Sequence, residues 1–174
     1  YIVFAADNGL AVGQHGLLGK QNLYDHSVRV PLVMSGPGIP KGRTSDSLCY
    51  LMDVCPTILD LAGISPPSEV SGVSLRPVLQ NQKARVRNEV IFAYRHFQRG
   101  IRTARWKLIE YNVDGKKTTQ LFDLSKDPDE RNNLASLPSH ATRIKSLRAL
   151  LQERMTGYGD RTQLDAGLWP AFGN

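Results

Sequence analysis

The first half of the chain alternates short apolar runs with loops rich in turn residues. The opening run, Tyr1 to Ala6, is too short for a helix and rich in β-branched and aromatic residues, so it predicts a buried strand. A second run, Leu32 to Met34, predicts another short strand, because a loop rich in Gly and Pro ends it. Apolar residues at near-helical spacing then run from Val54 to Gly63 and predict a helix, with Asp53 as its N-cap.

The second half shows a strand pattern followed by a single helical one. A polar and basic linker, residues 80–88, precedes it. The helical pattern runs from His140 to Met155, with apolar residues three and four positions apart. Together these patterns predict a small α+β subdomain, a four-stranded antiparallel sheet with one packed helix. The predicted strands are residues 89–94, 98–103, 107–111 and 119–124.

Composition and charge narrow the classes of function. The 174 residues are 41% hydrophobic and 22% charged, as in globular proteins, and no apolar run has the length of a membrane span. The net charge of +6 is scattered along the chain and is compatible with an anionic partner. We see no clustered basic face and no motif that would indicate nucleic-acid binding. Cys49 and Cys55 do not make a disulfide framework, and we expect buried free thiols.

The first apolar run ends at a turn whose side chains carry hard oxygen donors. Asp7, Asn8 and Gly9 follow the run directly, where open α/β sheets place their ligands. Carboxylate and carboxamide oxygens suit Ca²⁺ or Mg²⁺, and a glycine lets the chain turn sharply beneath an ion. On these three residues alone, however, a plain turn is the simpler interpretation.

Further motifs follow this turn in a fixed order. They read Ala6-Asp7-Asn8-Gly9, Gly13-Gln14-His15-Gly16, Gly19-Lys20, Tyr24-Asp25 and Arg29-Val30-Pro31. The series resembles the formylglycine-dependent sulfatases of the alkaline-phosphatase-like superfamily, in particular bacterial sulfatases similar to iduronate-2-sulfatase and choline sulfatase. A later segment, Leu121 to Leu134, resembles another motif of the family, so that the resemblance extends to about residue 158.

The resemblance implies an α/β fold with three parts. Residues 1–80 would be the C-terminal part of the catalytic α/β domain, with a segment of the alkaline-phosphatase-like sheet. Residues 81–158 would be the C-terminal α+β subdomain, with its four-stranded antiparallel sheet and one helix. The tail, residues 159–174, matches no motif of the family, but Trp169 and Phe172 predict that it docks on the rest of the chain.

The same resemblance implies roles for residues of the first motifs. Asp7 and Asn8 match metal ligands that, with an early pair of aspartates, hold one Ca²⁺ or Mg²⁺ against a sulfate oxygen. Lys20 matches the lysine that contacts the sulfate, and we expect it to be catalytic, because an ammonium group offsets the charge on the sulfate oxygens. His15 lies between them and is a candidate substrate-binding residue; a hydrogen-bonded loop histidine is the alternative.

Other polar residues are candidates for substrate binding or for holding the loop. His96 and Arg99 fall where the C-terminal subdomain can lean over the mouth of the active site, so they are candidate substrate-binding residues. A surface histidine between strands is the alternative for His96. Asp25 and Arg29 are expected to anchor the loop through ion pairs or backbone contacts.

Sulfatases of this family carry their nucleophile in an N-terminal Cys/Ser-x-Pro-Ser/Ala-Arg motif, whose first residue is oxidised to formylglycine. No such motif occurs in the 174 residues. We therefore expect a C-terminal part of a sulfatase that is inactive alone, with the N-terminal half of the same enzyme as its partner. A chain on its own would expose apolar surface at its first strand, which predicts self-association.

For the full-length protein the resemblance implies hydrolysis of sulfate esters, of a sulfated carbohydrate or of an aryl or alkyl sulfate, in the periplasm or outside the cell. The sequence does not identify the substrate, the choice between Ca²⁺ and Mg²⁺, or the Cys or Ser precursor of the formylglycine. Two alternatives stay open. One is a phosphodiesterase or phosphonate monoester hydrolase, which shares the turn; the other is a non-catalytic, stand-alone module.

Overall fold

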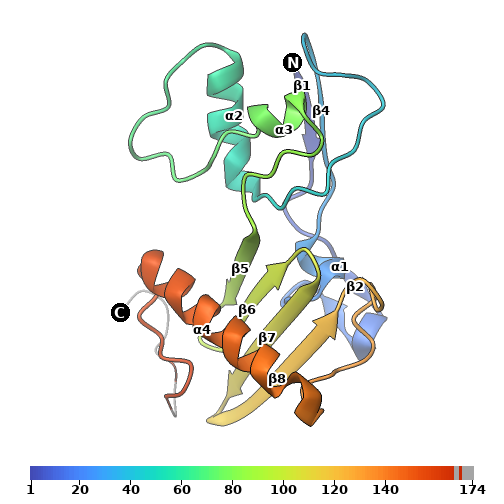
Figure 1. The fold of residues 1–174 in the computed structure, drawn as a ribbon, viewed down its shortest axis with the longest axis vertical. Coiled ribbons are helices and arrows are strands. Elements are labelled where there is room, and N and C mark those ends of the chain that lie inside the picture. The colour runs from blue at the N-terminus through green and yellow to red at the C-terminus, as the bar shows by residue number, and fades with distance from the viewer. Residues whose placement is uncertain (167–168, 170–174) are drawn as a thin grey trace. The chain divides into compact units, whose positions relative to one another are not determined.

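The computed structural model describes residues 1–166 and residue 169. The chain divides into two compact units, shown in Figure 1. The first unit contains Tyr1–Asp7 and Val30–Val90, and the second contains Asn8–Arg29 and the chain from Ile91 onward. Among the described residues, no helix combines the length and the apolar character needed to cross a bilayer. The three-part domain division expected from the sequence stays a prediction.

The first unit contains a small sheet of two strands. Strands β1 (Ile2–Ala5) and β4 (Leu32–Ser35) pair antiparallel, with Ile2 opposite Ser35. Both strands were expected, but the prediction that the first is buried is wrong in this structure, because Ile2 is 72% exposed and Phe4 63%. The side chains of a strand point to the two faces of its sheet, so they stay exposed where no other layer packs on that face. The helical elements of this unit are η2 (Leu51–Asp53), α2 (Val54–Leu61) and α3 (Arg76–Gln80).

The predicted helix of the first unit forms, but Asp53 has another role than the one expected. Its side chain makes no capping bond to α2. It is instead fully buried and accepts hydrogen bonds from the backbone N–H groups of Tyr50 (2.7 Å) and Val73 (2.8 Å). Arg87 donates to the same carboxylate, with 2.7 Å between Nη2 and Oδ1. Asp53 therefore ties separate segments of this unit together, because a buried carboxylate needs such donors.

The two cysteines of this unit are free, as expected. The prediction that they are buried is wrong for Cys55, which is exposed, while Cys49 is half-buried. Burial is the main cause that raises the pKa of the Cys49 thiol, and the neighbouring Asp53 carboxylate acts in the same direction.

The second unit is built on a four-stranded sheet in the order β5-β6-β7-β8. Strand β7 pairs antiparallel with β6 and with β8, so that Leu108 lies opposite both Ile101 and Leu121. The strands expected from the sequence are confirmed, and the structure lengthens the last two. Their bounds are β5 (Glu89–Tyr94), β6 (Gln98–Thr103), β7 (Trp106–Val113) and β8 (Lys116–Asp123).

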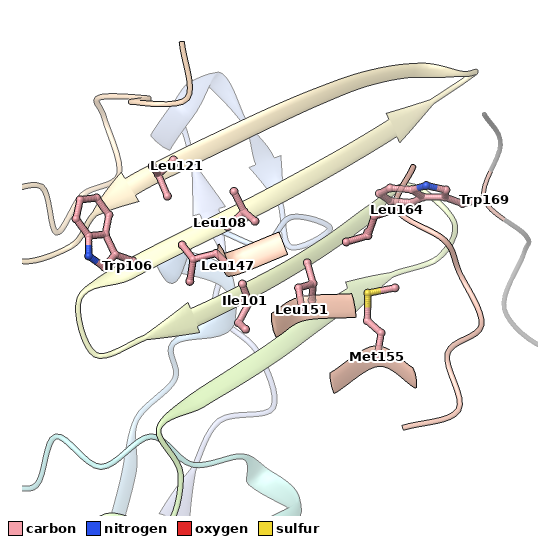
Figure 2. Packing of buried hydrophobic residues seen from close by; sticks show 9 residues of the cluster. All are labelled: Ile101, Trp106, Leu108, Leu121, Leu147, Leu151, Met155, Leu164 and Trp169. Atoms are coloured by element: carbon pink, nitrogen blue, oxygen red, sulfur yellow. The ribbon is translucent and has the colours of Figure 1, made fainter. Parts of the chain in front are cut away.

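One face of this sheet packs against α4 (Ala141–Gly157), which follows the short helix η3 (Pro138–His140). Figure 2 shows the side chains of α4 among those of the strands, in a cluster that excludes water. The predicted packed helix is thus confirmed. The members of the cluster are Ile101, Trp106, Leu108, Leu121, Leu147, Leu151, Met155, Leu164 and Trp169.

The tail docks on this cluster, as expected from its tryptophan. Trp169 is only 6% exposed and lies in the same cluster as Leu164 and Met155 (Figure 2). The other residue on which that prediction rested, Phe172, lies outside the described residues.

The opposite face of the sheet is covered by the segment of residues 8–29. Alternate side chains of a strand point to opposite faces, so Ile109 and Phe122 face away from α4. They form a second cluster with Leu23 and Tyr24 of this segment. The segment therefore belongs to the second unit, although it comes early in the sequence. Its elements are β2 (Ala11–Val12), η1 (Gln14–Gly16), β3 (Leu18–Gly19) and α1 (Asp25–Val28).

Candidate functional site

The turn after β1 is held against α1 at a glycine. The N–H of Gly9 donates to the carbonyl oxygen of Ser27 across 2.9 Å. A Cβ atom at position 9 would lie 2.0 Å from the carbonyl oxygen of His26, closer than any real contact. Glycine is therefore required by this close approach of two backbone segments, not by an unusual backbone angle.

A hairpin returns Lys20 to this turn. Strands β2 and β3 pair with Ala11 opposite Gly19, so the residue after β3 comes back beside the start of the hairpin. Lys20 Nζ donates a hydrogen bond of 2.8 Å to Asn8 Oδ1, and Asn8 Nδ2 donates to the carbonyl oxygen of Gly9. The structure thus brings together Asn8 and Lys20, two of the residues singled out in the sequence.

The oxygen donors at this turn fit part of a site for a hard divalent cation. The exposed carboxylate of Asp7 and the half-buried amide of Asn8 are adjacent in the chain. Oxygen ligands of this kind suit Ca²⁺ or Mg²⁺, but two of them are fewer than such ions take. Within the described part of the chain, no three His, Cys, Asp or Glu side chains gather to hold an ion.

His15 lies in the hairpin and stacks on an aromatic ring. Its ring centroid is 3.9 Å from that of Tyr24, with the planes at 4°, and 5.5 Å from that of His26. Burial lowers the pKa of His26, and the charge of His15 adds to the effect. His15 itself is exposed beside Gln14 and Gly16. Its expected contact with substrate stays a prediction.

The loop that carries these residues is anchored by Asp25, as expected from the sequence. Its carboxylate lies 2.8 Å from Lys107 Nζ and 3.6 Å from Arg102 Nη2, both on the sheet. For Arg29 the anchoring contact is with the backbone, because its N–H donates to the carbonyl oxygen of Asp25 across 2.8 Å. Asp25 thus ties the loop to the sheet, and the N–H of Arg29 closes the turn at the end of α1.

Lys107 and Glu130 complete this anchor, and the sequence reasoning gave them no role. Lys107 is fully buried, and its Nζ lies 2.7 Å from Glu130 Oε1. Glu130 Oε2 in turn accepts the N–H of Asp25 across 2.6 Å. Burial raises the pKa of the Glu130 carboxyl, and the Lys107 ammonium opposes that rise. In the sequence, this network could have been predicted from Lys107, because it is a charged residue inside the apolar run of residues 106–109.

The two remaining candidate residues lie apart from the turn. His96 packs beside Phe97, with ring centroids 4.0 Å apart. Arg99 is only 1% exposed, and its guanidinium donates to Asp160 (2.7 Å) and to Thr162 Oγ1 (3.0 Å). These contacts give Arg99 a structural role in docking the tail. The expected contact of His96 and Arg99 with substrate stays a prediction.

Comparisons with known proteins agree with the motifs and with this architecture. A family model described as "N-sulphoglucosamine sulphohydrolase, C-terminal" matches residues 13–157. An N-acetylglucosamine-6-O-sulfatase of Bacteroides thetaiotaomicron is 34% identical over 91% of this chain, and arylsulfatase K of Mus musculus is 36% identical over 78%. One solved structure, a protein in complex with its substrate D-glucosamine-2-N,6-O-disulfate, covers 94% of this chain with a TM-score of 0.82 and 31% identity.

The chain spans only part of these relatives. It covers 30% of the Bacteroides enzyme, 27% of the mouse enzyme and 35% of the solved chain. The matched family model describes a C-terminal region, and the four-stranded sheet and long helix found here match the C-terminal regions of sulfatases. The chain therefore belongs to the sulfatases of the alkaline-phosphatase-like superfamily, as a C-terminal part that is similar to bacterial glycosaminoglycan sulfatases.

Proposed function

We propose that the full-length protein hydrolyses a sulfate ester of a sulfated saccharide, and that this chain supplies part of its active site. The observation that carries the proposal is the 2.8 Å hydrogen bond from Lys20 to Asn8. It joins an ammonium group to a hard oxygen donor on a turn that is fixed to α1 through Gly9. The names of the relatives support the sulfated saccharide as the class of substrate.

Each residue of the turn has a distinct task in this proposal. Lys20 offsets the negative charge on the sulfate oxygens and on the departing oxygen. Asp7 and Asn8 supply oxygen ligands for Ca²⁺ or Mg²⁺, and a bound cation would supply Lewis acidity at a sulfate oxygen. The N-terminal half would bring the formylglycine nucleophile, so the 174-residue chain alone would be inactive. His15 and His96 would contact substrate, whereas the buried guanidinium of Arg99 would hold the tail.

The first test is turnover of 4-nitrophenyl sulfate and of a 6-O-sulfated glucosamine by the full-length protein and its Lys20→Ala variant. Since Lys20 interacts with charge that develops in the reaction, we expect kcat/KM to fall by about 10²- to 10³-fold. Lys41→Ala is the matched control, because Lys41 is also an exposed loop lysine, and it should keep full activity.

Two results would contradict the proposal. In one, Lys20→Ala retains the turnover of the unaltered protein on both sulfate esters. In the other, the full-length protein cleaves only a phosphonate monoester or a phosphodiester, assayed in parallel, which would favour the phosphoesterase alternative. Circular dichroism of the variants checks that any loss of turnover is not a loss of fold.

A further inference from the structure

A cavity of about 670 Å³ opens on the α4 face of the sheet in the second unit. It lies between the start of β7, the end of β8, the chain that follows β8, and the start of α4. A volume of this size is in the range of sites for small ligands, of about 300–1,000 Å³. The residues described above as a candidate active site do not line it.

The acidic side chains of this cavity are already committed to protein donors. Asp123 pairs with Arg105 at 2.6 Å and accepts from Ser125 Oγ at 2.6 Å. The hydrogen bond from Arg105 is the main cause that holds the pKa of Asp123 far below its usual range, so this carboxylate is charged. Asp127 accepts the backbone N–H groups of residues 131 and 132.

The remaining cations of the cavity are Lys126 and Arg143. In the part of the chain that the structure describes, no carboxylate lies within ion-pair distance of Lys126 or Arg143. Arg143 is instead held over the ring of Trp106, with its Cζ 4.8 Å from the ring centroid. This contact orients a guanidinium at the wall of the cavity and leaves its N–H groups available to an anion. The charges of Arg105 and Asp123 cancel. The two positive charges of Lys126 and Arg143 therefore exceed the one remaining negative charge, that of Asp127.

We propose that this cavity is a second binding site for a sulfated saccharide, in which Arg143 and Lys126 bind a sulfate group. The planar guanidinium matches two sulfate oxygens, and the ammonium adds a point charge. Neutral polar groups at the same wall, Asn132, Ser139 and Thr142, suit the hydroxyl groups of a sugar ring. The choice of a saccharide rests on the proposed function.

The site would lie across the sheet from the turn that carries Asn8 and Lys20. Residues 8–29 pack on the face of Ile109 and Phe122, whereas α4 packs on the face of Leu108 and Leu121. A saccharide in the cavity would therefore not occupy the place of the reacting sulfate. The cavity would instead bind another part of a longer saccharide chain, or a neighbouring saccharide chain.

Hydrogen–deuterium exchange of the full-length protein tests this, because it locates binding along the chain. The probes are a heparin-derived sulfated tetrasaccharide, its desulfated form and inorganic sulfate. We expect the sulfated tetrasaccharide alone to slow exchange in residues 124–146. In Arg143→Glu and in Lys126→Glu, the concentration needed for half of this protection should rise about tenfold or more, because each variant replaces a charge-assisted contact by repulsion. Lys145→Glu, an exposed change on the same helix, should behave as the unaltered protein.

Protection that is equal in all variants, or absent in the unaltered protein, would overturn the proposal. Protection by inorganic sulfate as strong as that by the tetrasaccharide would overturn the saccharide as the ligand. Turnover of 4-nitrophenyl sulfate is measured on the same samples. It tests the proposed function separately, since Arg143 and Lys126 have no part in that reaction.

Discussion

Gly9 lies where the chain has no room for a side chain, and this gives a direct prediction. Gly9→Ala would place a methyl group against the carbonyl oxygen of His26, so the turn or α1 must shift. We expect a loss of about 1–3 kcal/mol in the free energy of unfolding, as for overpacked sites, measured by urea denaturation. Gly157→Ala is the control, because no atom lies within 4 Å of its added Cβ and it lies in a helix. Because Gly157 is the last residue of α4, we expect no loss of stability and a gain below the roughly 0.5–1 kcal/mol of a mid-helix glycine. Equal effects of the two changes would contradict this account.

Lys107 is a second position at which one side chain holds several others. Lys107→Met would leave the carboxylates of Asp25 and Glu130 without their buried cation. Breaking a buried pair by removing one partner costs about 3–5 kcal/mol of stability. Adding Glu130→Gln to this variant should restore part of the loss, because one of the uncompensated charges is removed. A double variant less stable than Lys107→Met would argue against the network.

The stability lost in Lys107→Met should depend on pH, and the direction follows from the pKa of Glu130. Burial raises the folded pKa of Glu130, so its proton stabilises the folded state below the unfolded pKa, and that contribution is lost as pH rises through the folded value. Without Lys107 the folded pKa rises further. The difference in stability between Lys107→Met and the unaltered protein should therefore shrink as pH falls from 7 to 5. A difference that is constant over this range would show that Glu130 does not titrate as described.

At the scale of single residues, the sequence pointed to the residues of the turn but not to the buried residues that anchor its loop. Asp7, Asn8 and Lys20 were singled out because they fall in motifs with fixed spacing, and the structure brings Asn8 and Lys20 together, whereas their roles stay predictions. The partners of the anchor were not found, because Lys107 and Glu130 lie far from Asp25 in sequence. Only the tertiary fold brings them to it.

Among the elements, the tail after α4 is held by a buried ion pair as well as by the apolar cluster. Arg99 is almost fully buried, and its guanidinium is paired with Asp160. Burial raises the pKa of Asp160, but hydrogen bonds from Thr162 and Arg99 outweigh it, so the pKa is lowered overall and the carboxylate stays charged at neutral pH.

Removal of this carboxylate should release the tail. Asp160→Ala removes the carboxylate that pairs with the buried guanidinium of Arg99, and we expect a loss of about 3–5 kcal/mol in the free energy of unfolding. We also expect faster limited proteolysis after α4. Asp165→Ala, a change of the same kind at an exposed tail residue, should have little effect. Unchanged proteolysis in Asp160→Ala would mean that apolar contacts such as that of Trp169 suffice to hold the tail.

The strands and the long helix were predictable because their apolar periodicity is regular. Strands β5 and β6 have the bounds read from the sequence. Burial was harder to predict, because it depends on which face another segment covers. The strand β1 has the composition of a buried strand, yet Phe4 and Ile2 are exposed here.

For the whole molecule, the two units should differ in their resistance to opening. Strand β7 is covered on both faces, whereas β1 and β4 form an isolated pair, a structure that is marginal in water. In the 174-residue chain we expect the amides of β7 to exchange about a hundredfold more slowly than those of β1, since exchange reports local opening. Similar rates in both strands would contradict this. The predicted self-association, and the periplasmic or secreted location, stay predictions.

Because both faces of β7 are covered, the alternation of its side chains between the two faces cannot change. Its even-numbered residues, such as Leu108, pack in the cluster of α4. Its odd-numbered residues, Lys107 and Ile109, contact the segment of residues 8–29 on the other face. Inserting one residue within the strand would turn a buried ammonium into the apolar cluster and a leucine toward two carboxylates. The turn at Asp114 and Gly115 imposes no such condition, because both residues are exposed and cover neither face. A residue added in this turn would therefore leave the alternation within β7 intact, whereas a residue added within β7 would reverse it.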